Sequence, residues 1–380
     1  MYTRRHLPSL LACTAIAGTL LTLAAPATAA TVTWSVTPSP SPGDAGKLDA
    51  VSCTGPAFCM AAGSVNGSTG TLAETWNGRA WSVTPSPSPG GDPDELFGVS
   101  CTGPAFCMAA GWHYNSSARV YQTLAETWNG RAWTITPTAS PSPQNVLFGV
   151  SCVSAARCTA VGYTDAGRGF QTLVETWNGR TWSVTASPAD GTGGVLQAVS
   201  CRSAVSCQAV GWQQGTSGSV TLAESWNGSA WSTHASASPG SGSNELLGVS
   251  CTSPANCMAV GFYSVGTGPD RTLAQTWNGS TWTVATTPNR TPLADSLEAV
   301  SCAGSARCVA AGYYGNESAH GRTLIESWSG PKWSIVASPD PGVDNQLLGV
   351  ACTAATSCRA AGYQGSGSLL SGATLVETGS

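Results

Sequence analysis

Charged residues are scarce in this chain of 380 residues: Asp, Glu, Lys and Arg make up 9%, against about 25% in an ordinary globular protein. The 16 basic and 20 acidic residues give a formal net charge of −4. A nucleic-acid binder that works through a broad basic surface is therefore excluded. Long charged helices are excluded as well, because Lys, Glu and Arg are too few to build them.

Catalytic and cofactor motifs are also missing. The chain has four His, and it contains no Ser-His-Asp spacing, no phosphate-cradling glycine loop and no metal-binding motif. We therefore expect no cofactor and no metal. A disordered acidic chain is equally excluded, because 42% of the residues are hydrophobic and 15 are Trp.

Residues 1–29 have the pattern of a secretory signal peptide. Arg4 and Arg5 precede an apolar run over residues 7–25, and small residues at 27–29 supply a cleavage site. We expect the mature chain to begin at Ala30 and to be secreted without membrane insertion, since no later run has the length of a membrane span. The adjacent arginines leave twin-arginine export open as an alternative to the general secretory route.

A unit of about fifty residues recurs along the mature chain. It reads Leu-x-Ala/Gly-Val-Ser-Cys, five residues, Cys-x-Ala-x-Gly, a variable loop, Thr-Leu-x-Glu-x-Trp-Asn-Gly-x-x-Trp and a Ser/Pro-rich connector. Residues 71–81 and 123–133 are identical. Repeats at such a period indicate a solenoid, a propeller or another array.

Each unit is expected to form four short strands. In the first unit these are residues 48–53, 59–63, 71–76 and 79–83. No segment after residue 29 shows helical periodicity over a useful length. Four-stranded units of this length are typical of a β-propeller. We therefore predict an all-β fold, a seven-bladed β-propeller over residues 30–380 with four-stranded antiparallel blades.

The Asn77-Gly78 pair predicts a two-residue hairpin in which both turn residues have positive φ. Trp76 would then face Arg79, and Glu74 would face Trp81. One sheet face would be bulky and the other small, which suits radial packing of one blade on the next. Small residues are expected where the innermost strands crowd at the axis, and Ala or Gly indeed occupies positions 50, 98, 149, 198, 248, 299 and 349.

The two ends of the chain complement each other. The seventh unit stops at residues 377–380 without a fourth strand, whereas residues 31–36 form an orphan fourth strand. We predict that the N-terminal strand closes the ring, so that the seventh blade combines residues 31–37 with residues 347–378.

The stretch TLAETWNGRAWSV resembles the third and fourth strands of a kelch repeat of the galactose-oxidase-like kind, although Ala62-Gly63 stands where kelch repeats have a Gly-Gly pair. Residues 75–81 are similar to a shortened Asp-box hairpin of sialidase-type propellers, with Asn in place of Asp. The whole repeat resembles those of secreted bacterial propellers with one Cys pair per blade. These resemblances imply a propeller fold but say little about activity, because propellers have many unrelated functions.

Fourteen cysteines of the mature chain fall into seven pairs with five residues between the partners. Fixed spacing, an even count and an export signal indicate disulfides within each unit. Zinc is disfavoured, because two thiolates without clustered His leave the metal short of four ligands. The predicted bonds are Cys53–Cys59, Cys101–Cys107, Cys152–Cys158, Cys201–Cys207, Cys251–Cys257, Cys302–Cys308 and Cys352–Cys358.

An acid recurs between Leu and Trp on the bulky face, at Glu74, Glu126, Glu175, Glu224, Glu326 and Glu377, with Gln275 in the fifth unit. Catalysis would need one acid in a distinctive place. Six copies instead predict a structural hydrogen bond to backbone or to an indole N–H. The repeated Trp residues of the hairpins are likewise expected to be structural.

The variable loops between second and third strands are where binding is expected, because variable loops on a repeated scaffold usually carry function. Six of the seven units place an aromatic residue at the start of this loop, and the first unit has Ser64 there. These rings either cap the core or stack on a ligand. The candidate ligand-binding residues are Trp112, His113, Tyr163, Arg168, Trp212, Phe262, Asp270, Arg271, Tyr313 and Tyr363.

We therefore expect a monomeric, non-catalytic binding module for a glycan, a cell-wall polymer or an exported protein. An extracellular hydrolase or lyase with one axial site is the alternative, and a structural surface or matrix protein is the third. Equivalent pockets between blades would favour a lectin. One axial cleft with converging His, Asp and Arg would favour an enzyme, and a loop face without a pocket would favour a structural protein.

Overall fold

The structure is a computed structural model that describes residues 32–43, 45–65, 67–89, 91–188, 193–290, 292–315, 320–368 and 371–380. The predicted signal peptide over residues 1–29 lies outside these ranges. Within them the chain forms 28 strands and no helix, so this part of the chain offers no helix long and apolar enough to cross a membrane.

The strands follow the sequence repeats, and we number the repeats accordingly. Repeat 1 comprises β2 (Gly46–Gly55), β3 (Phe58–Val65), β4 (Gly70–Trp76) and β5 (Trp81–Thr84); repeat 2 comprises β6 (Asp94–Gly103), β7 (Phe106–Asn115), β8 (Val120–Trp128) and β9 (Trp133–Ile135); repeat 3 comprises β10 (Gln144–Ser154), β11 (Arg157–Asp165), β12 (Gln171–Trp177) and β13 (Trp182–Val184); repeat 4 comprises β14 (Gly194–Ser203), β15 (Ser206–Gln214), β16 (Ser219–Trp226) and β17 (Trp231–His234). Repeat 5 comprises β18 (Asn244–Ser253), β19 (Asn256–Tyr263), β20 (Arg271–Trp277) and β21 (Trp282–Val284); repeat 6 comprises β22 (Asp295–Gly304), β23 (Arg307–Gly315), β24 (Gly321–Trp328) and β25 (Trp333–Val336); repeat 7 comprises β26 (Asp344–Ala354), β27 (Ser357–Ser368) and β28 (Ser371–Gly379).

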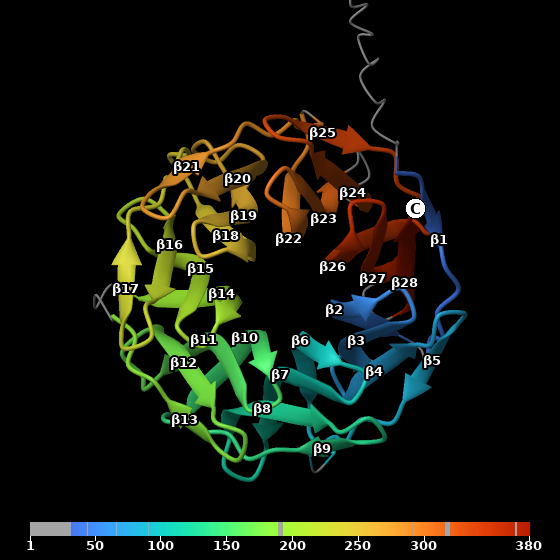
Figure 1. The fold of residues 1–380 in the computed structure, drawn as a ribbon, viewed down its shortest axis with the longest axis vertical. Helices are drawn as coiled ribbons and strands as arrows, with labels where there is room; N and C mark the ends of the chain where they lie inside the picture. The colour runs from blue at the N-terminus through green and yellow to red at the C-terminus, as the bar shows by residue number, and fades with distance from the viewer. Residues whose placement is uncertain are drawn as a thin grey trace, which may run out of the picture. The chain divides into compact units, whose positions relative to one another are not determined.

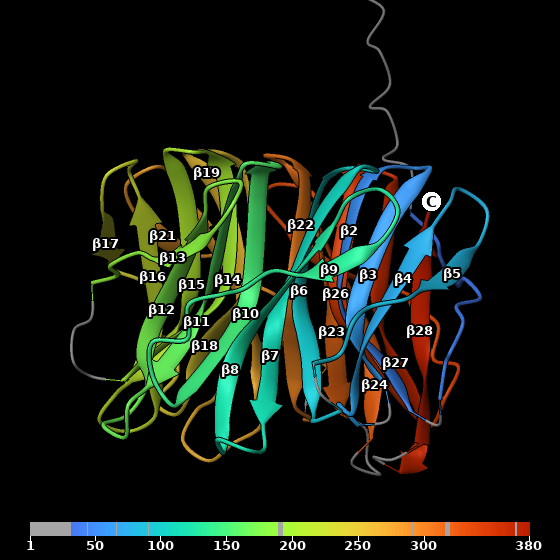
Figure 2. The same ribbon diagram turned by 90° about the horizontal axis from the view of Figure 1, so that it is seen from below.

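Repeats 1 to 6 each pair four strands in chain order as antiparallel neighbours, and repeat 7 pairs its three strands in the same way. Repeats 2 and 3 are joined by one parallel contact between Tyr121 and Gln144. The remaining strand, β1 (Trp34–Val36), pairs with β28 and sets Trp34 opposite Gly379. The first strand of each repeat lies innermost around a central axis (Figure 1), and the strands run lengthwise between two ends that carry the loops (Figure 2).

The core lies between neighbouring repeats, as the alternation of bulky and small faces predicts. Between repeats 1 and 2, Ala62 and Ala73 pack against Leu96, Trp128 and Trp133. Burial of a Trp removes a large apolar area from water and dominates such a core. The equivalent clusters recur at the other junctions of the described chain, including the junction of repeats 7 and 1.

The small residues of the innermost strands face one another at the axis, which confirms their predicted role. A Cβ added at Gly98 would lie 3.0 Å from the Phe148 carbonyl oxygen, and one added at Gly349 would lie 2.9 Å from the Ala50 Cα. Both distances are too short for a side chain to be added without a shift of the backbone. Together these strands line an axial channel of about 200 Å³.

The predicted hairpin register is wrong. Trp76 pairs with Trp81, not with Arg79, and Glu74 faces Val83, so four residues connect the strands and the fourth strand begins at Trp81. Of the two expected turn residues, Gly78 alone has positive φ (93°). The Asn77 side chain explains the longer turn, because its Oδ1 accepts hydrogen bonds from the N–H groups of Arg79 and Ala80.

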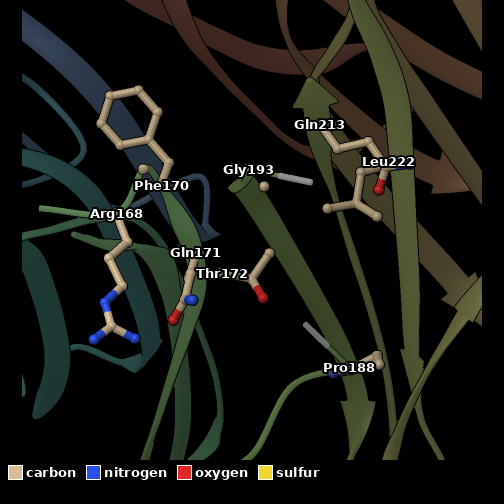
Figure 3. A pocket seen from close by; sticks show the side chains of 10 residues that line it. Arg168, Phe170, Gln171, Thr172, Pro188, Gly193, Gln213 and Leu222 are labelled. Carbon is tan, nitrogen blue, oxygen red and sulfur yellow. The ribbon is translucent and has the colours of Figure 1, made fainter. Parts of the chain in front are cut away.

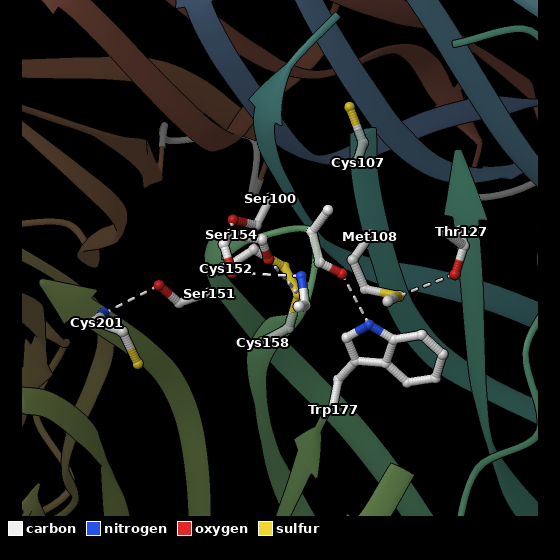
Figure 4. Close-up of a disulfide and its surroundings, with 12 residues drawn as sticks. Ser100, Cys107, Met108, Thr127, Ser151, Cys152, Ser154, Cys158, Trp177 and Cys201 are labelled. Carbon is white, nitrogen blue, oxygen red and sulfur yellow. Dashed lines mark hydrogen bonds between the residues drawn. A yellow bond between two sulfur atoms is a disulfide. The ribbon is translucent and has the colours of Figure 1, made fainter. Parts of the chain in front are cut away.

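All seven predicted disulfides are present. Each joins the first and second strands of one repeat, as Figure 4 shows for Cys152–Cys158. The serine before the first cysteine of repeats 1 to 6 links neighbouring repeats: the Cys152 N–H donates to the Ser100 hydroxyl (2.9 Å), and the Cys201 N–H donates to the Ser151 hydroxyl (2.9 Å). Hydrogen bonds of this kind fix the stagger between adjacent sheets.

The repeated acids are buried. The predicted hydrogen bond to backbone is present at Glu175, whose Oε2 accepts from the Ala139 N–H (3.1 Å), whereas other acids accept from connector hydroxyls. Thr71 donates to the Ser86 hydroxyl in the connector (2.9 Å), which donates to Glu126 Oε2 of the next repeat (2.7 Å). Burial raises the pKa of Glu126 to about 8. The indole N–H of Trp76 donates instead to the Pro56 carbonyl (3.0 Å). Five acids therefore attach the preceding connector to their own repeat: Glu74, Glu126, Glu175, Glu224 and Glu377.

Candidate functional site

The loops between second and third strands lie at the same end of the molecule as the connectors. We call this end the loop face. The Asp94 N–H at the end of one connector donates a hydrogen bond to the Ser68 carbonyl in such a loop (2.9 Å). At the end of another connector, the Gly194 N–H donates to the Phe170 carbonyl (3.1 Å). The opposite end, which carries the disulfide-linked hairpins and the Asn-Gly turns, is the hairpin face.

Part of the predicted aromatic set forms a continuous row on the loop face. The centroid of the Tyr163 ring lies 4.7 Å from that of Phe170, and Phe170 lies 6.3 Å from Trp212. Phe148, which lines the axial channel, extends the row inward to 5.9 Å from Tyr163. Tyr163 and Trp212 are half-buried, whereas Phe170 is 42% exposed. The rings thus both cap the core and present an apolar edge to solvent.

The other predicted residues lie apart from this row. Trp112 packs on Tyr121, with 5.1 Å between the ring centroids. The neighbouring His113 is half-buried, and burial lowers its pKa although the nearby Asp92 acts in the opposite direction. Phe262 is half-buried on β19.

Arg168 borders a small cavity of about 30 Å³ between repeats 3 and 4. Figure 3 shows Phe170 and Thr172 on one side of this cavity and Gln213 and Leu222 on the other. It has room for about one water molecule, so it is too small for a ligand such as a sugar.

Asp270, Arg271 and Tyr313 lie near one another on repeats 5 and 6. Burial raises the pKa of Tyr313 to about 12, with Glu298 and Asp270 adding to the effect. The Asp270 carbonyl accepts a hydrogen bond from the Asp295 N–H (2.9 Å). These three residues share the loop face with the aromatic row but form no common pocket with it.

A cavity large enough for a small ligand lies where repeats 7 and 1 meet on the loop face, and a second one of about 540 Å³ lies between the outer strands of repeats 5 and 6. The volume of the first cavity is about 430 Å³, within the range of about 300–1,000 Å³ that is usual for small-molecule sites. One predicted residue, Tyr363, borders this first cavity. The other side chains that matter are Lys47, Asp49, Ser64, Asp344, Gln346 and Leu348.

Lys47 is held by two carboxylates at the edge of this cavity. Its Nζ lies 3.0 Å from Asp49 Oδ1 and 2.5 Å from Glu95 Oε1. Burial opposes the charge of Lys47, but the two carboxylates outweigh burial and raise its pKa. Burial raises the pKa of Asp49 to about 7, although Lys47 acts in the opposite direction.

The sequence reasoning missed this cluster, although the repeat alignment carries a signal for it. Repeat 1 reads Lys47-Leu48-Asp49 where repeat 2 reads Glu95-Leu96-Phe97, and Ser64 replaces the aromatic residue of the other repeats. Ser64 is the departure from a recurring residue type, because the positions of Lys47 and Asp49 vary from repeat to repeat. Among the described residues, no group of three His, Cys, Asp or Glu could hold a metal ion.

No family model and no curated protein matches the chain. Among solved structures it is similar to YCF48 from Cyanidioschyzon merolae, with a TM-score of 0.54 and 15% identity over 91% of this chain and 98% of that one. It is also similar to a protein of unknown function from Dyadobacter fermentans DSM 18053, with a TM-score of 0.50 and 8% identity over 92% and 98% of the two chains. At these identities the likeness shows the fold alone. Together with the repeated four-stranded sheets it defines a β-propeller repeat protein.

Proposed function

We propose that this chain is a secreted, non-catalytic binding module that holds a glycan, a cell-wall component or an exported protein on its loop face. Seven intrachain disulfides indicate an oxidising, extracellular environment. Residues 1–29 would direct export. The observation that carries the proposal is the 430 Å³ cavity on the same face as the half-exposed aromatic row.

The seven repeats would form seven blades of a closed ring, with β1 as the fourth strand of the last blade. The pairing of β1 with β28 supports this arrangement. So does the packing of Ala361 and Val376 against Leu48 of repeat 1, together with the close approach of Gly349 to Ala50. The kelch-like and Asp-box-like hairpins are in keeping with such blades. Closure would keep the two sides of the cavity in place.

A carbohydrate-active hydrolase or lyase is the second candidate. One observation favours it: Asp49, whose pKa is raised to about 7, shares the cavity with Asp344. Glycoside hydrolysis uses two carboxyl groups that face one substrate, and a raised pKa on one of them suits the role of general acid. Release of a chromophore from aryl glycosides, lost in Asp49→Asn, would favour this candidate. The structural-protein alternative expects a loop face without a pocket, and the cavity weighs against it.

The test is a binding screen of the oxidised protein, residues 30–380, against a glycan array and purified cell-wall polymers. Trp212→Ala and Trp112→Ala remove rings from the loop face, and we expect each to weaken binding at least about fivefold, the loss of one stacked ring. Val205→Ala is the matched control, because Val205 is 58% exposed on the hairpin face. Binding that is lost equally in all three variants, or absent altogether, would count against the proposal.

A further inference from the structure

We infer that the cavity where repeats 7 and 1 meet binds an amino sugar and holds its ammonium group at Asp49. This inference rests on the proposed function, because it names the ligand class for that same loop face. It follows from the balance of hydrogen-bond donors and acceptors, from the charge of the walls and from the shape of the space.

Three donors that border the cavity, those of Lys47, Ser64 and Ser68, are already engaged. The Lys47 ammonium contacts Asp49 Oδ1 and Glu95 Oε1. The Ser64 hydroxyl donates to Glu95 Oε1 (3.2 Å), and the Ser68 hydroxyl donates to Glu95 Oε2 (3.0 Å). Glu95 is thus saturated, and these donors have little left to offer an incoming ligand.

Acceptors, by contrast, are in surplus. The Asp49 side chain is 9% exposed, and within the described chain its Oδ2 has no hydrogen-bond partner. Asp344 Oδ1 accepts from the Gly321 N–H (2.7 Å), but Asp344 Oδ2 meets only the Tyr363 hydroxyl at a long 3.5 Å. A buried acceptor without a partner is unfavourable. A ligand that donates hydrogen bonds would therefore match the carboxylate oxygens of Asp49 and Asp344.

The charge of the walls selects the kind of donor. The carboxylates of Asp49, Glu95 and Asp344 surround one cation, Lys47. Because Lys47 is already neutralised by two of them, the remaining field is negative and favours a cation over a phosphate, a sulfate or a uronate. A primary ammonium supplies three donors and a positive charge in one compact group.

The shape favours a sugar ring over a slender side chain. Glycines at 46, 67, 365 and 372 border the space and keep it wide, because they carry no side chain. The Tyr363 ring and Leu348 provide apolar surface for the C–H face of a pyranose. A lysine side chain would fill only part of 430 Å³ and would leave the remaining acceptors unpaired.

The experiment is an NMR titration of the oxidised protein, residues 30–380, with glucosamine, N-acetylglucosamine, glucuronate and Nα-acetyl-lysine amide. We expect glucosamine to bind at least about tenfold more tightly than N-acetylglucosamine, the effect of one charge-assisted hydrogen bond. Asp49→Asn should weaken glucosamine binding by about the same factor. Glu298→Gln is the matched control, because Glu298 is the equivalent residue of repeat 6 and lies outside the cavity.

A second variant, Leu348→Trp, fills the cavity without touching a carboxylate and should abolish glucosamine binding, with a thermal melt to confirm that each variant folds. Equal affinity for glucosamine and N-acetylglucosamine, or full binding by Asp49→Asn, would overturn the inference. Stronger binding of the lysine derivative would point to a peptide ligand, and stronger binding of glucuronate would point to an anion held by Lys47. Either result would overturn the amino-sugar assignment.

The failure of the inference is distinguishable from the failure of the proposed function. If polymer binding is lost in Trp212→Ala but is unchanged in Asp49→Asn, the loop face binds a glycan elsewhere and only the inference fails. If no glycan or polymer binds, both fail.

Discussion

At six junctions of the described chain, a serine hydroxyl accepts a hydrogen bond from the first cysteine N–H of the next repeat. At the junction of repeats 7 and 1 the corresponding residue is Ala351, which has no hydroxyl. Apolar packing and the connector hydrogen bonds persist there, since Leu48 packs on Ala361 and Ser39 donates to Glu74. Packing therefore joins the repeats everywhere, and the serine bond is an addition that one junction lacks.

The same junction carries the polar cavity. In repeat 3 the positions of Lys47 and Asp49 are held by Val146 and Phe148, and Phe148 packs on Tyr163. On the loop face, repeats 3 and 4 thus carry contacts between aromatic rings, whereas repeats 7 and 1 carry an open cavity lined by charged side chains. The scaffold is regular in its core and specialised at one place on its surface.

The largest expected difference between the junctions concerns β1. Trp34→Ala removes a side chain that is 8% exposed, and we expect a loss of about 3–5 kcal/mol in the free energy of unfolding. Trp133→Ala, at the matching place in repeat 2, should cost less, because β9 is held by the chain on both sides. Guanidinium unfolding of the oxidised protein measures both. Equal losses would show that β1 is no more dependent on its Trp than an internal strand.

A smaller effect concerns pH. Burial raises the pKa of Glu126 to about 8 and that of Glu74 to about 7, from an ordinary 4.5. Between pH 4.5 and these values the folded state keeps protons that the unfolded chain releases, so stability is full at acidic pH and falls as pH rises. We expect each acid to lower the free energy of unfolding by on the order of 2–4 kcal/mol between pH 5 and pH 9.

Variants of these acids allow the pH dependence of stability to be compared between junctions. Thermal melts across this pH range should be flatter for Glu126→Gln than for the parent protein. Glu74→Gln should flatten the profile less, because hydrogen bonds from Ser39 and Thr374 already limit its shift. Gln275→Glu, which adds the acid that repeat 5 lacks, should make it steeper. A profile that rises toward pH 9 would contradict the assignment.

The smallest expected effect concerns the serine bond itself. Ser151→Ala removes the acceptor for the Cys201 N–H and should cost about 0.5–1.5 kcal/mol. Ala351→Ser should add the missing bond to Cys53 and gain up to a similar amount. Urea unfolding of the two variants and their parent gives both values. A loss in Ala351→Ser would mean that the junction of repeats 7 and 1 has a different stagger.

The fold could be predicted because one pattern is written seven times. Cys pairs, Trp pairs and small axial residues each have one physical explanation, and agreement among the copies removes most ambiguity. The hairpin register could not be predicted, since Asn77-Gly78 fits both a two-residue turn and the longer turn in which the Asn77 side chain binds Arg79 and Ala80. The turn preferences of the Asn-Gly backbone do not take such a side-chain hydrogen bond into account.

The binding residues predicted from the sequence lie on the same face as the candidate cavity, but most of them do not border it. The aromatic positions were chosen for their recurrence, and of these Tyr363 alone borders this cavity. Lys47 and Asp49 were missed because they occupy a strand that the repeat pattern assigns to the core. Their pairing with Glu95 of the next repeat becomes visible only when the sheets are placed side by side.

The bulky-on-small contact between repeats has a practical consequence for protein engineering. Since the same bulky and small positions meet at each interface, the repeats share one packing scheme that does not depend on the exposed parts of their loops. Residues 166–169, which are exposed, could be randomised as a library while the cores remain unchanged. The molecule would then serve as a disulfide-stabilised scaffold for selecting new specificities.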